Sequence, residues 1–198
     1  MSKYLKMEKK NIHLENFKEA ITSTVRSISE IEDCKVTFGE QTKNDDKSAN
    51  LPEIKKLENI EDYFVLRATA DSEALRLKYS NIEIFNNFKP KGSNALKLYE
   101  IAEKIRYEKI GSDKFKGIRK NLSHNTEIKK PENSTEVFFE KYLKNSLFNK
   151  KEIKNLDTKT KKLKKNFDDK FSKNLDELKK SITNQAKFNK IIANAISK

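Results

Sequence analysis

Apolar residues recur every three or four positions near the start of the chain, which is the spacing of one face of an amphipathic helix. This stripe begins at Leu14 and ends at Ile31, where a polar pair interrupts it. Residues 34–38 then alternate in a β-rich composition and stop at Gly39. The pattern predicts a helix followed by a short strand.

A second β-rich run occupies residues 63–66 and is expected to pair with the first strand. The polar residues 41–50 between the two runs lack periodicity and predict a loop, which Leu51-Pro52 ends. Thr69 or Asp71 is expected to cap a following helix, since a short polar side chain accepts from the free N–H groups of a first helical turn. The region therefore predicts one short hairpin-like β element and a helix.

Two further helices are predicted in the middle of the chain. Ser93 is expected to cap the first, which runs to Gly111, and residues 112–122 form a second, shorter one. The stretch 123–133 is polar and contains Pro131, so we interpret it as an internal boundary.

The last third of the chain carries two apolar patterns with helical spacing. Ser134 or Thr135 is expected to cap a helix with aromatic residues on one face, which extends to Leu147. From residue 163 to 196 an apolar stripe continues with one slip at Asn184, and it predicts a long C-terminal amphipathic helix. No cap residue closes this stripe, so we expect the chain to be a truncated fragment of a longer protein.

These elements together predict a mainly α fold with a small β element, in the α+β class. We divide the chain into a helical core with the β element at residues 1–122, a polar linker at 123–133 and a C-terminal helical segment at 134–198. The length of 198 residues suits one domain, or one domain with an appendage.

Composition changes this picture in one respect, the choice of partner. Hydrophobic residues make up 35% of the chain and charged residues 37%, so much of it must be solvated. The formal net charge of +13 is typical of polyanion binders, but only five of the 43 basic residues are arginine. Such a lysine-rich composition indicates compositional drift and argues against nucleic acid as the partner.

The sequence shows no membrane span and no export signal. No apolar run reaches the length of a transmembrane helix, and the charged N-terminus lacks the apolar segment of a signal peptide. Cys34 is the single cysteine and therefore has no disulfide partner within the chain. These features predict a cytoplasmic protein.

Residue patterns typical of catalysis or ligand binding are absent from the sequence. There is no G-x-x-x-x-G-K-[ST] phosphate loop, and the four glycines are too sparse to cradle a phosphate. His13, His124 and Cys34 lack the spacing of metal ligands. We therefore assign no catalytic, cofactor-binding or metal-binding residue to this chain.

Several segments carry a longer pattern of ordinary residues in a fixed order. Two of them are FKEAITSTVRSISEIEDCKVTFGE at 17–40 and RATADSEALRLKYSN at 67–81. A third, PKGSNALKLYEIAEKIRYEKIGSDKFKGIRKNL, occupies 90–122, and a weaker one, LDELKKSITNQAKF, lies at 175–188. In this order they resemble the N-terminal region of CobT, the non-catalytic subunit of the ATP-dependent aerobic cobaltochelatase.

The resemblance implies a subunit that assembles with an AAA+ ATPase subunit, CobS, and a large catalytic subunit, CobN. That complex uses ATP and Mg²⁺ to insert Co²⁺ into hydrogenobyrinic acid a,c-diamide during cobalamin (vitamin B12) biosynthesis. The present region is then expected to hold and orient the ATPase, with no cofactor of its own. The family is also expected to continue into an acidic linker and a von Willebrand A domain, whose D-x-S-x-S motif this chain lacks.

Two alternatives stay open at this point. The lysine-rich region 150–165 and its neighbouring phenylalanines are compatible with a basic helical module that binds RNA or an acidic protein surface. A CobS–CobT-like pair is also compatible with a remodelling target other than the cobalt chelatase.

The arginines are the sharpest signal at the level of single residues, because the composition so strongly favours lysine. A retained guanidinium indicates a contact that needs its planar fork, such as a bidentate bond to a carboxylate. We interpret them either as ion pairs that tie helices together or as contacts with a partner subunit, and we expect Asp71 to be one such contact. The candidate residues are Arg26, Arg67, Asp71, Arg76, Arg106 and Glu108, with Glu73 and Glu103 as further carboxylate partners.

Overall fold

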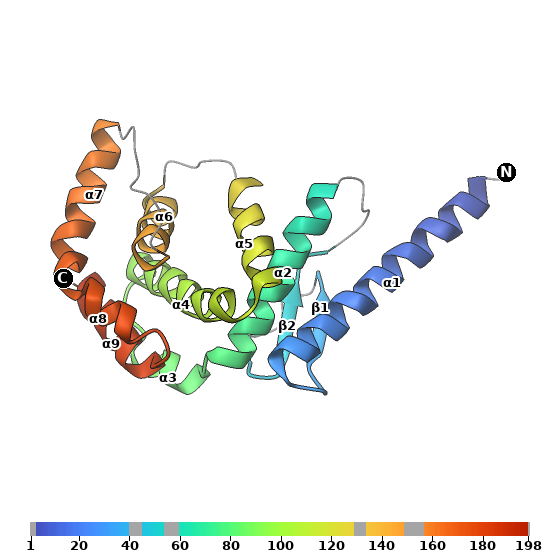
Figure 1. Cartoon of the computed structure of the whole chain (residues 1–198), viewed down its shortest axis with the longest axis horizontal. Coiled ribbons are helices and arrows are strands. Elements are labelled where there is room, and N and C mark those ends of the chain that lie inside the picture. The colour runs from blue at the N-terminus through green and yellow to red at the C-terminus, as the bar shows by residue number, and fades with distance from the viewer. Residues whose placement is uncertain (1–2, 40–44, 54–59, 129–133, 149–156, 198) are drawn as a thin grey trace. The chain divides into compact units, whose positions relative to one another are not determined.

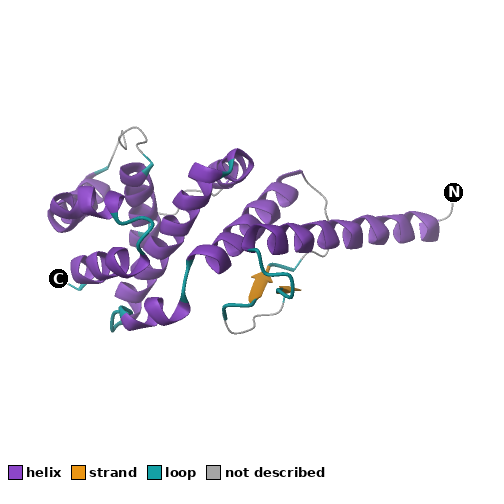
Figure 2. Ribbon diagram, turned by 60° about the horizontal axis from the view of Figure 1, so that its bottom comes forward, coloured by secondary structure: helices purple, strands orange, loops and turns teal. Residues whose placement is uncertain are grey.

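The computed structural model describes residues 3–39, 45–53, 60–128, 134–148 and 157–197. Within these ranges the chain is mainly helical with one two-stranded sheet, which confirms the predicted α+β class (Figure 2). It forms two compact units. The first unit comprises Met1–Lys78 and Phe115–Ile128, and the second comprises Tyr79–Lys114 and Lys129–Lys198.

Helices and a small sheet build the first unit. Its elements are α1 (Lys3–Ser29), β1 (Lys35–Phe38), β2 (Ser48–Leu51), α2 (Ile60–Tyr79) and α5 (Lys116–Ile128), labelled in Figure 1. The predicted stripe on the first helix is confirmed, because Ile21 and Val25 are buried in the core of this unit. The sheet contributes Ala49 and Leu51 to the same core.

The sheet differs from the predicted hairpin. β1 pairs in parallel with β2, in a register that runs from Lys35 opposite Ser48 to Phe38 opposite Leu51. The predicted second strand, 63–66, was wrong, since these residues lie in α2. Leu66, Ala70 and Ala74 there are spaced four residues apart and are all buried, so packing of a helical face overrides the local β propensity.

Predicted caps around α2 also need correction. Thr69 and Asp71 lie inside α2, where the Thr69 hydroxyl donates to the carbonyl of Val65, 2.8 Å away. Helix α2 ends at Tyr79, and a separate helix α3 (Ile82–Asn87) follows. Asn81 caps α3, because its side chain accepts from the N–H groups of the first helical turn.

The second unit is a group of helices around an aromatic core. Besides α3, its elements are α4 (Ser93–Lys114), α6 (Thr135–Leu147), α7 (Thr158–Phe171), a 3₁₀ turn η1 (Ser172–Asn174), α8 (Leu175–Lys180) and α9 (Gln185–Ile196). α4 packs against both α6 and α9. The core includes Phe139 and Phe167, whose ring centroids lie 5.1 Å apart. Ser134 caps α6, which confirms one of the two caps predicted for this helix, Ser134 or Thr135.

The long C-terminal helix predicted from residue 163 onward was wrong. The stripe is broken by η1 and again at residues 181–184, so that it forms α7, α8 and α9. Asn184, the position of the slip, caps α9 by accepting from the N–H of Lys187 at 3.0 Å. Breaking the helix allows Phe171 and Phe188 to enter one core from different directions, which a straight helix cannot do.

The compact units also differ from the predicted division at 123–133. α4 packs with the C-terminal helices, although we had placed it in the core of residues 1–122. Residues 123–128 are the end of α5, where the ring of His124 lies 4.4 Å from that of Phe64. The remaining linker residues, 129–133, lie outside the described residues. In the part of the chain that the structure describes, no helix is long and apolar enough to cross a membrane.

Candidate functional site

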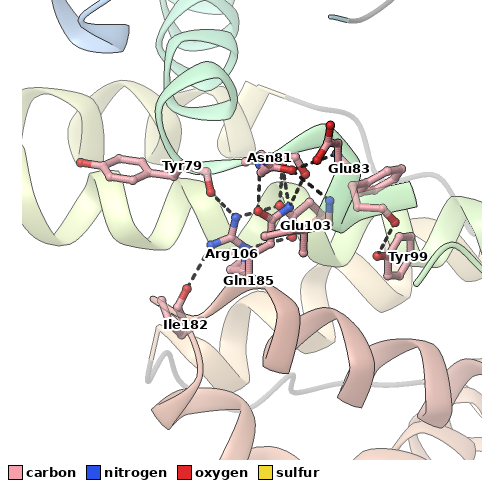
Figure 3. Close-up of polar contacts among 11 residues, drawn as sticks. Tyr79, Asn81, Glu83, Tyr99, Glu103, Arg106, Ile182 and Gln185 are labelled. Atoms are coloured by element: carbon pink, nitrogen blue, oxygen red, sulfur yellow. Dashed lines mark hydrogen bonds and ion pairs between the residues drawn. The ribbon is translucent and has the colours of Figure 1, made fainter. Parts of the chain in front are cut away.

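Arg106 is the centre of a network of polar contacts in the second unit (Figure 3). It lies on α4 with 1% of its surface exposed. Its Nε and Nη2 atoms each bind a different carboxylate oxygen of Glu103, and both distances are 2.8 Å. Because the two residues are three positions apart on one helix, α4 itself orients this bidentate pair.

The same guanidinium also binds main-chain carbonyls that are distant in sequence. Nη1 donates to the carbonyl of Ile182 at 3.2 Å, and Nη2 donates to the carbonyl of Tyr79. These carbonyls belong to the turn between α8 and α9 and to the last residue of α2. Arg106 therefore links α4 to the end of α2 and to the turn before α9. The two carbonyls that it binds are main-chain groups, so a substitution at residue 79 or 182 does not remove them.

Gln185 extends this network from the start of α9. Its Oε1 accepts from the N–H of Asn81 at 2.8 Å, and its Nε2 donates to the carbonyl of Asn81 at 3.0 Å. Ser80 links the two halves, since its hydroxyl donates to Glu103 at 2.6 Å and accepts from Gln185 at 3.2 Å. The network is buried and largely satisfied, which is typical of a group that fixes one arrangement of helices.

Glu108 joins α4 to α6 by a second ion-pair cluster. Only 3% of its surface is exposed, and its two oxygens lie 3.4 Å from Lys144 Nζ and 3.8 Å from Lys104 Nζ. Lys144 also binds Glu140 at 2.7 Å. Burial acts to lower the pKa of the Lys144 ammonium, but the two carboxylates outweigh it and raise that pKa above 10.5.

Asp71 is the buried carboxylate of the first unit. Its side chain is fully buried, with Oδ1 3.2 Å from Arg67 Nε and Oδ2 accepting from Asn121 Nδ2 at 2.7 Å. Arg67 in turn donates to the Thr24 hydroxyl at 3.1 Å. Asp71 and its partners thus connect α1, α2 and α5, and the carboxylate itself is not presented at the surface.

Replacing Asp71 with asparagine should change how stability depends on pH. Burial raises the pKa of the Asp71 carboxyl above its ordinary 3.8, against the opposing effects of Asn121 and Arg67. The folded chain then binds more protons than the unfolded chain just above pH 3.8, so this carboxyl destabilises the fold increasingly as pH rises through that window. Urea unfolding at several pH values should show the advantage of wild type over Asp71→Asn shrinking with rising pH; a growing advantage would contradict the raised pKa.

Arg76 and Arg26 attach helices to the sheet region of the first unit. Arg76 pairs with Glu73 at 3.0 Å and donates to the main-chain carbonyls of Ser48 at 2.6 Å and Asp45 at 3.1 Å. Arg26, at the end of α1, donates through Nε to the carbonyl of Cys34 at 3.2 Å. Both guanidinium groups hold backbone at the start of a strand or just before it.

The sequence that builds these networks matches a known protein family. The family described as cobalamin biosynthesis protein CobT matches residues 11–137, which is more than half of the chain. This chain belongs to the CobT family. It is therefore a member of a family of cobalamin biosynthesis proteins. No solved structure was found that matches it.

The CobT match covers all six candidate residues from the sequence, and the structure places each of them in a polar contact. Three of the arginines pair with carboxylates on their own helix, Arg106 with Glu103, Arg67 with Asp71 and Arg76 with Glu73. Arg26 binds backbone, and Glu108 binds two lysines. The networks of Asp71, Arg76 and Arg26 belong to the first unit, and those of Arg106 and Glu108 belong to the second.

Several members of these networks are not among the residues predicted from the sequence. Asn121 lies within the third segment that resembles CobT, but its distance of fifty positions from Asp71 hid the contact. Gln185 lies outside the residues that the family model matches. A usable signal exists for it: Gln185 is a polar residue on the same helical face as the buried Phe188 and Ile192.

Metal-ligating and nucleophilic side chains are the remaining candidates for chemistry in this member of the CobT family. Among the described residues no group of three or more His, Cys, Asp or Glu side chains is placed to hold a metal ion. Cys34 is buried, and burial raises the pKa of its thiol above 9.0, which keeps it a poor nucleophile.

Proposed function

We propose that this chain is a subunit of an ATP-dependent cobaltochelatase, in which it acts as the assembly domain that binds an AAA+ ATPase partner. The observation that carries the proposal is the CobT family match over residues 11–137. Those residues include the whole described part of the first unit from residue 11, together with α3 and α4. The buried arginine networks support the proposal, because a docking domain must present rigid faces.

The ligase reaction itself belongs, in this proposal, to the partner subunits. ATP and Mg²⁺ are bound by the AAA+ subunit, and Co²⁺ enters hydrogenobyrinic acid a,c-diamide on a large CobN-like subunit. The sequence offers no phosphate loop for the nucleotide. The present chain contributes position and orientation of the ATPase.

Arg67 is the member of the Asp71 network that we propose to face the partner. Its side chain is 39% exposed, whereas that of Asp71 is fully buried. An arginine held at one end by Asp71 loses little conformational freedom when its exposed edge meets a carboxylate of another protein. We therefore propose that Arg67, and not Asp71, contacts the partner subunit.

Co-purification of this chain with the AAA+ and CobN-like subunits of its own organism tests the assembly role. We expect the chain to bind the ATPase subunit, and cobalt insertion by the mixture to require all three proteins. Arg67→Gln should weaken the binding, while Lys91→Gln, an exposed change in the second unit, should leave it unchanged. Insertion that proceeds equally well without this chain would refute the proposal.

The isolated chain is expected neither to hydrolyse ATP nor to insert cobalt. The reason is the absence of a phosphate loop from the sequence and of a metal-ligand cluster from the described residues. A phosphate-release assay on the purified chain, with the complex as positive control, measures this. Turnover that survives further purification and follows the protein peak would contradict the assignment.

Polyanion binding is a second candidate function, favoured by the outer face of α7. Three exposed lysines lie there, Lys161, Lys162 and Lys165. None of them forms an ion pair with another residue that the structure describes. If this face binds RNA or an acidic surface, retention on heparin should fall with salt and fall further in a variant with all three lysines changed to glutamine. Equal retention of wild type and variant would exclude α7 as a polyanion site.

A further inference from the structure

An open groove of about 610 Å³ lies in the first unit, between α1 and β1. Six side chains of α1 line it at spacings of three and four, so they form one face of that helix. Thr37 and Phe38 of β1 line the other side. The α1 side chains are Glu15, Lys18, Glu19, Thr22, Ser23 and Arg26.

One edge of β1 is free of any third strand in the described part of the chain. On its other edge, the N–H of Lys35 donates to Lys47 and that of Gly39 donates to Leu51, at 2.9 and 2.8 Å. Main-chain groups alternate in direction along a strand. The odd-numbered residues of β1 therefore bond to β2, and Val36 and Phe38 point their N–H and C=O groups toward the free edge.

The groove meets this edge at the C-terminal half of β1, where Thr37 and Phe38 line it. Cys34 has the same parity as Val36, and its carbonyl accepts from Arg26 Nε at 3.2 Å. At the other end of β1, Lys18 Nζ lies 5.7 Å from the centre of the Phe38 ring. The lining face of α1 thus runs beside the free edge from Arg26 to Lys18, in the region where Figure 1 draws β1 next to α1.

We propose that this groove binds an extended peptide segment of another protein, which adds to the free edge of β1 as a third strand. Val36 and Phe38 each present one main-chain N–H and one C=O at this edge, two residues apart. The main chain of an extended peptide has its own N–H and C=O groups at the same spacing and can pair with them. An exposed strand edge is a ready template for such pairing. This inference rests on the geometry of the first unit and is independent of the proposed chelatase role.

The charges along the groove define which peptide fits. At the start of β1, Arg26 binds Cys34 through Nε, and its two terminal nitrogens make no hydrogen bond to another described residue. These nitrogens can bind a carboxylate as a fork. At the far end, Glu15 pairs with Lys18 at 3.1 Å, while Glu19 is exposed and in no ion pair with a described residue. The bound segment therefore has an acidic side chain near Arg26 and a basic one near Glu19.

The test uses the whole chain and a synthetic probe. Random seven-residue peptides displayed on phage are selected against the protein, and the enriched sequence is synthesised. We expect enrichment of β-prone peptides with an acid at one end and a base at the other. At saturation with this peptide, amide hydrogen exchange should slow at Val36 and Phe38, while Thr37, already bonded to β2, changes little. Protection elsewhere, or no enrichment, would overturn the proposal.

Two variants separate main-chain pairing from general adhesion. Arg26→Lys should raise the dissociation constant of the peptide about tenfold, because one charge-assisted hydrogen bond of the guanidinium fork is lost. The matched change Arg119→Lys, on an exposed position of α5, should leave it unchanged. Two peptides are compared, one N-methylated at its odd residues and one at its even residues; the one whose methyl groups replace the amide hydrogens that face β1 should not bind, and this result needs no change in the protein. Binding of both methylated peptides as tight as that of the unmodified peptide would show that the edge of β1 is not used.

Discussion

Arg106→Lys is expected to destabilise the second unit by about 3 kcal/mol, although the substitution conserves the charge. A lysine can reach Glu103, but it cannot also donate to the carbonyls of Ile182 and Tyr79. At least one buried carbonyl and part of a buried carboxylate then lose their partners, and each such loss is expensive away from water. Thermal melts followed by circular dichroism measure the effect.

Lys104→Arg provides the matched control for this prediction. Lys104 lies on the same helix, is 42% exposed at its side chain and has a 3.8 Å contact with Glu108. An arginine there keeps the charge and needs no buried fork, so its melting temperature should stay close to that of the wild type. Equal melting temperatures for the two variants would show that the Arg106 fork does not stabilise the unit.

Asp71→Lys is expected to unfold the first unit, with a loss of about 4 kcal/mol or more. The substitution places an ammonium where a fully buried carboxylate meets Arg67 and Asn121. It replaces an attraction to Arg67 with a repulsion, and it places the new ammonium in a site that excludes water. Since whole domains are stable by only about 5–15 kcal/mol, a loss of this size is a large fraction of the total. Urea unfolding measures it.

Glu61→Lys is the control for Asp71→Lys, because it reverses a charge in the exposed first turn of the same helix. A change of this kind costs a few tenths of a kcal/mol through the helix dipole. The sequence alone led us to expect a docking defect in Asp71→Lys. With Asp71 buried, any loss of ATPase binding should follow the loss of folding, and a well-folded Asp71→Lys variant would contradict the burial.

Local patterns in the sequence were sufficient for most of the helices. The stripe that places Ile21 and Val25 on one face of α1 and the cap at Ser134 depend on residues within one or two turns of each other. The chemical value of the arginines was also readable, because a lysine-rich chain that keeps Arg106 needs a fork there. The sequence likewise determined membership of the CobT family, through the order of many ordinary residues over 11–137.

Tertiary structure decided everything that joins residues far apart in the chain. Residues 48–51, and not 63–66, pair with β1. Residues 63–66 lie in α2, where burial of one helical face stabilises the fold more than pairing as a strand would. Tertiary structure also broke the C-terminal stripe into three helices, whose apolar residues share one core with α4. The main-chain carbonyls that Arg106 binds, and the free edge of β1 beside α1, carry no side-chain signature at all. Their positions follow from long-range packing, which periodicity along a single segment does not encode.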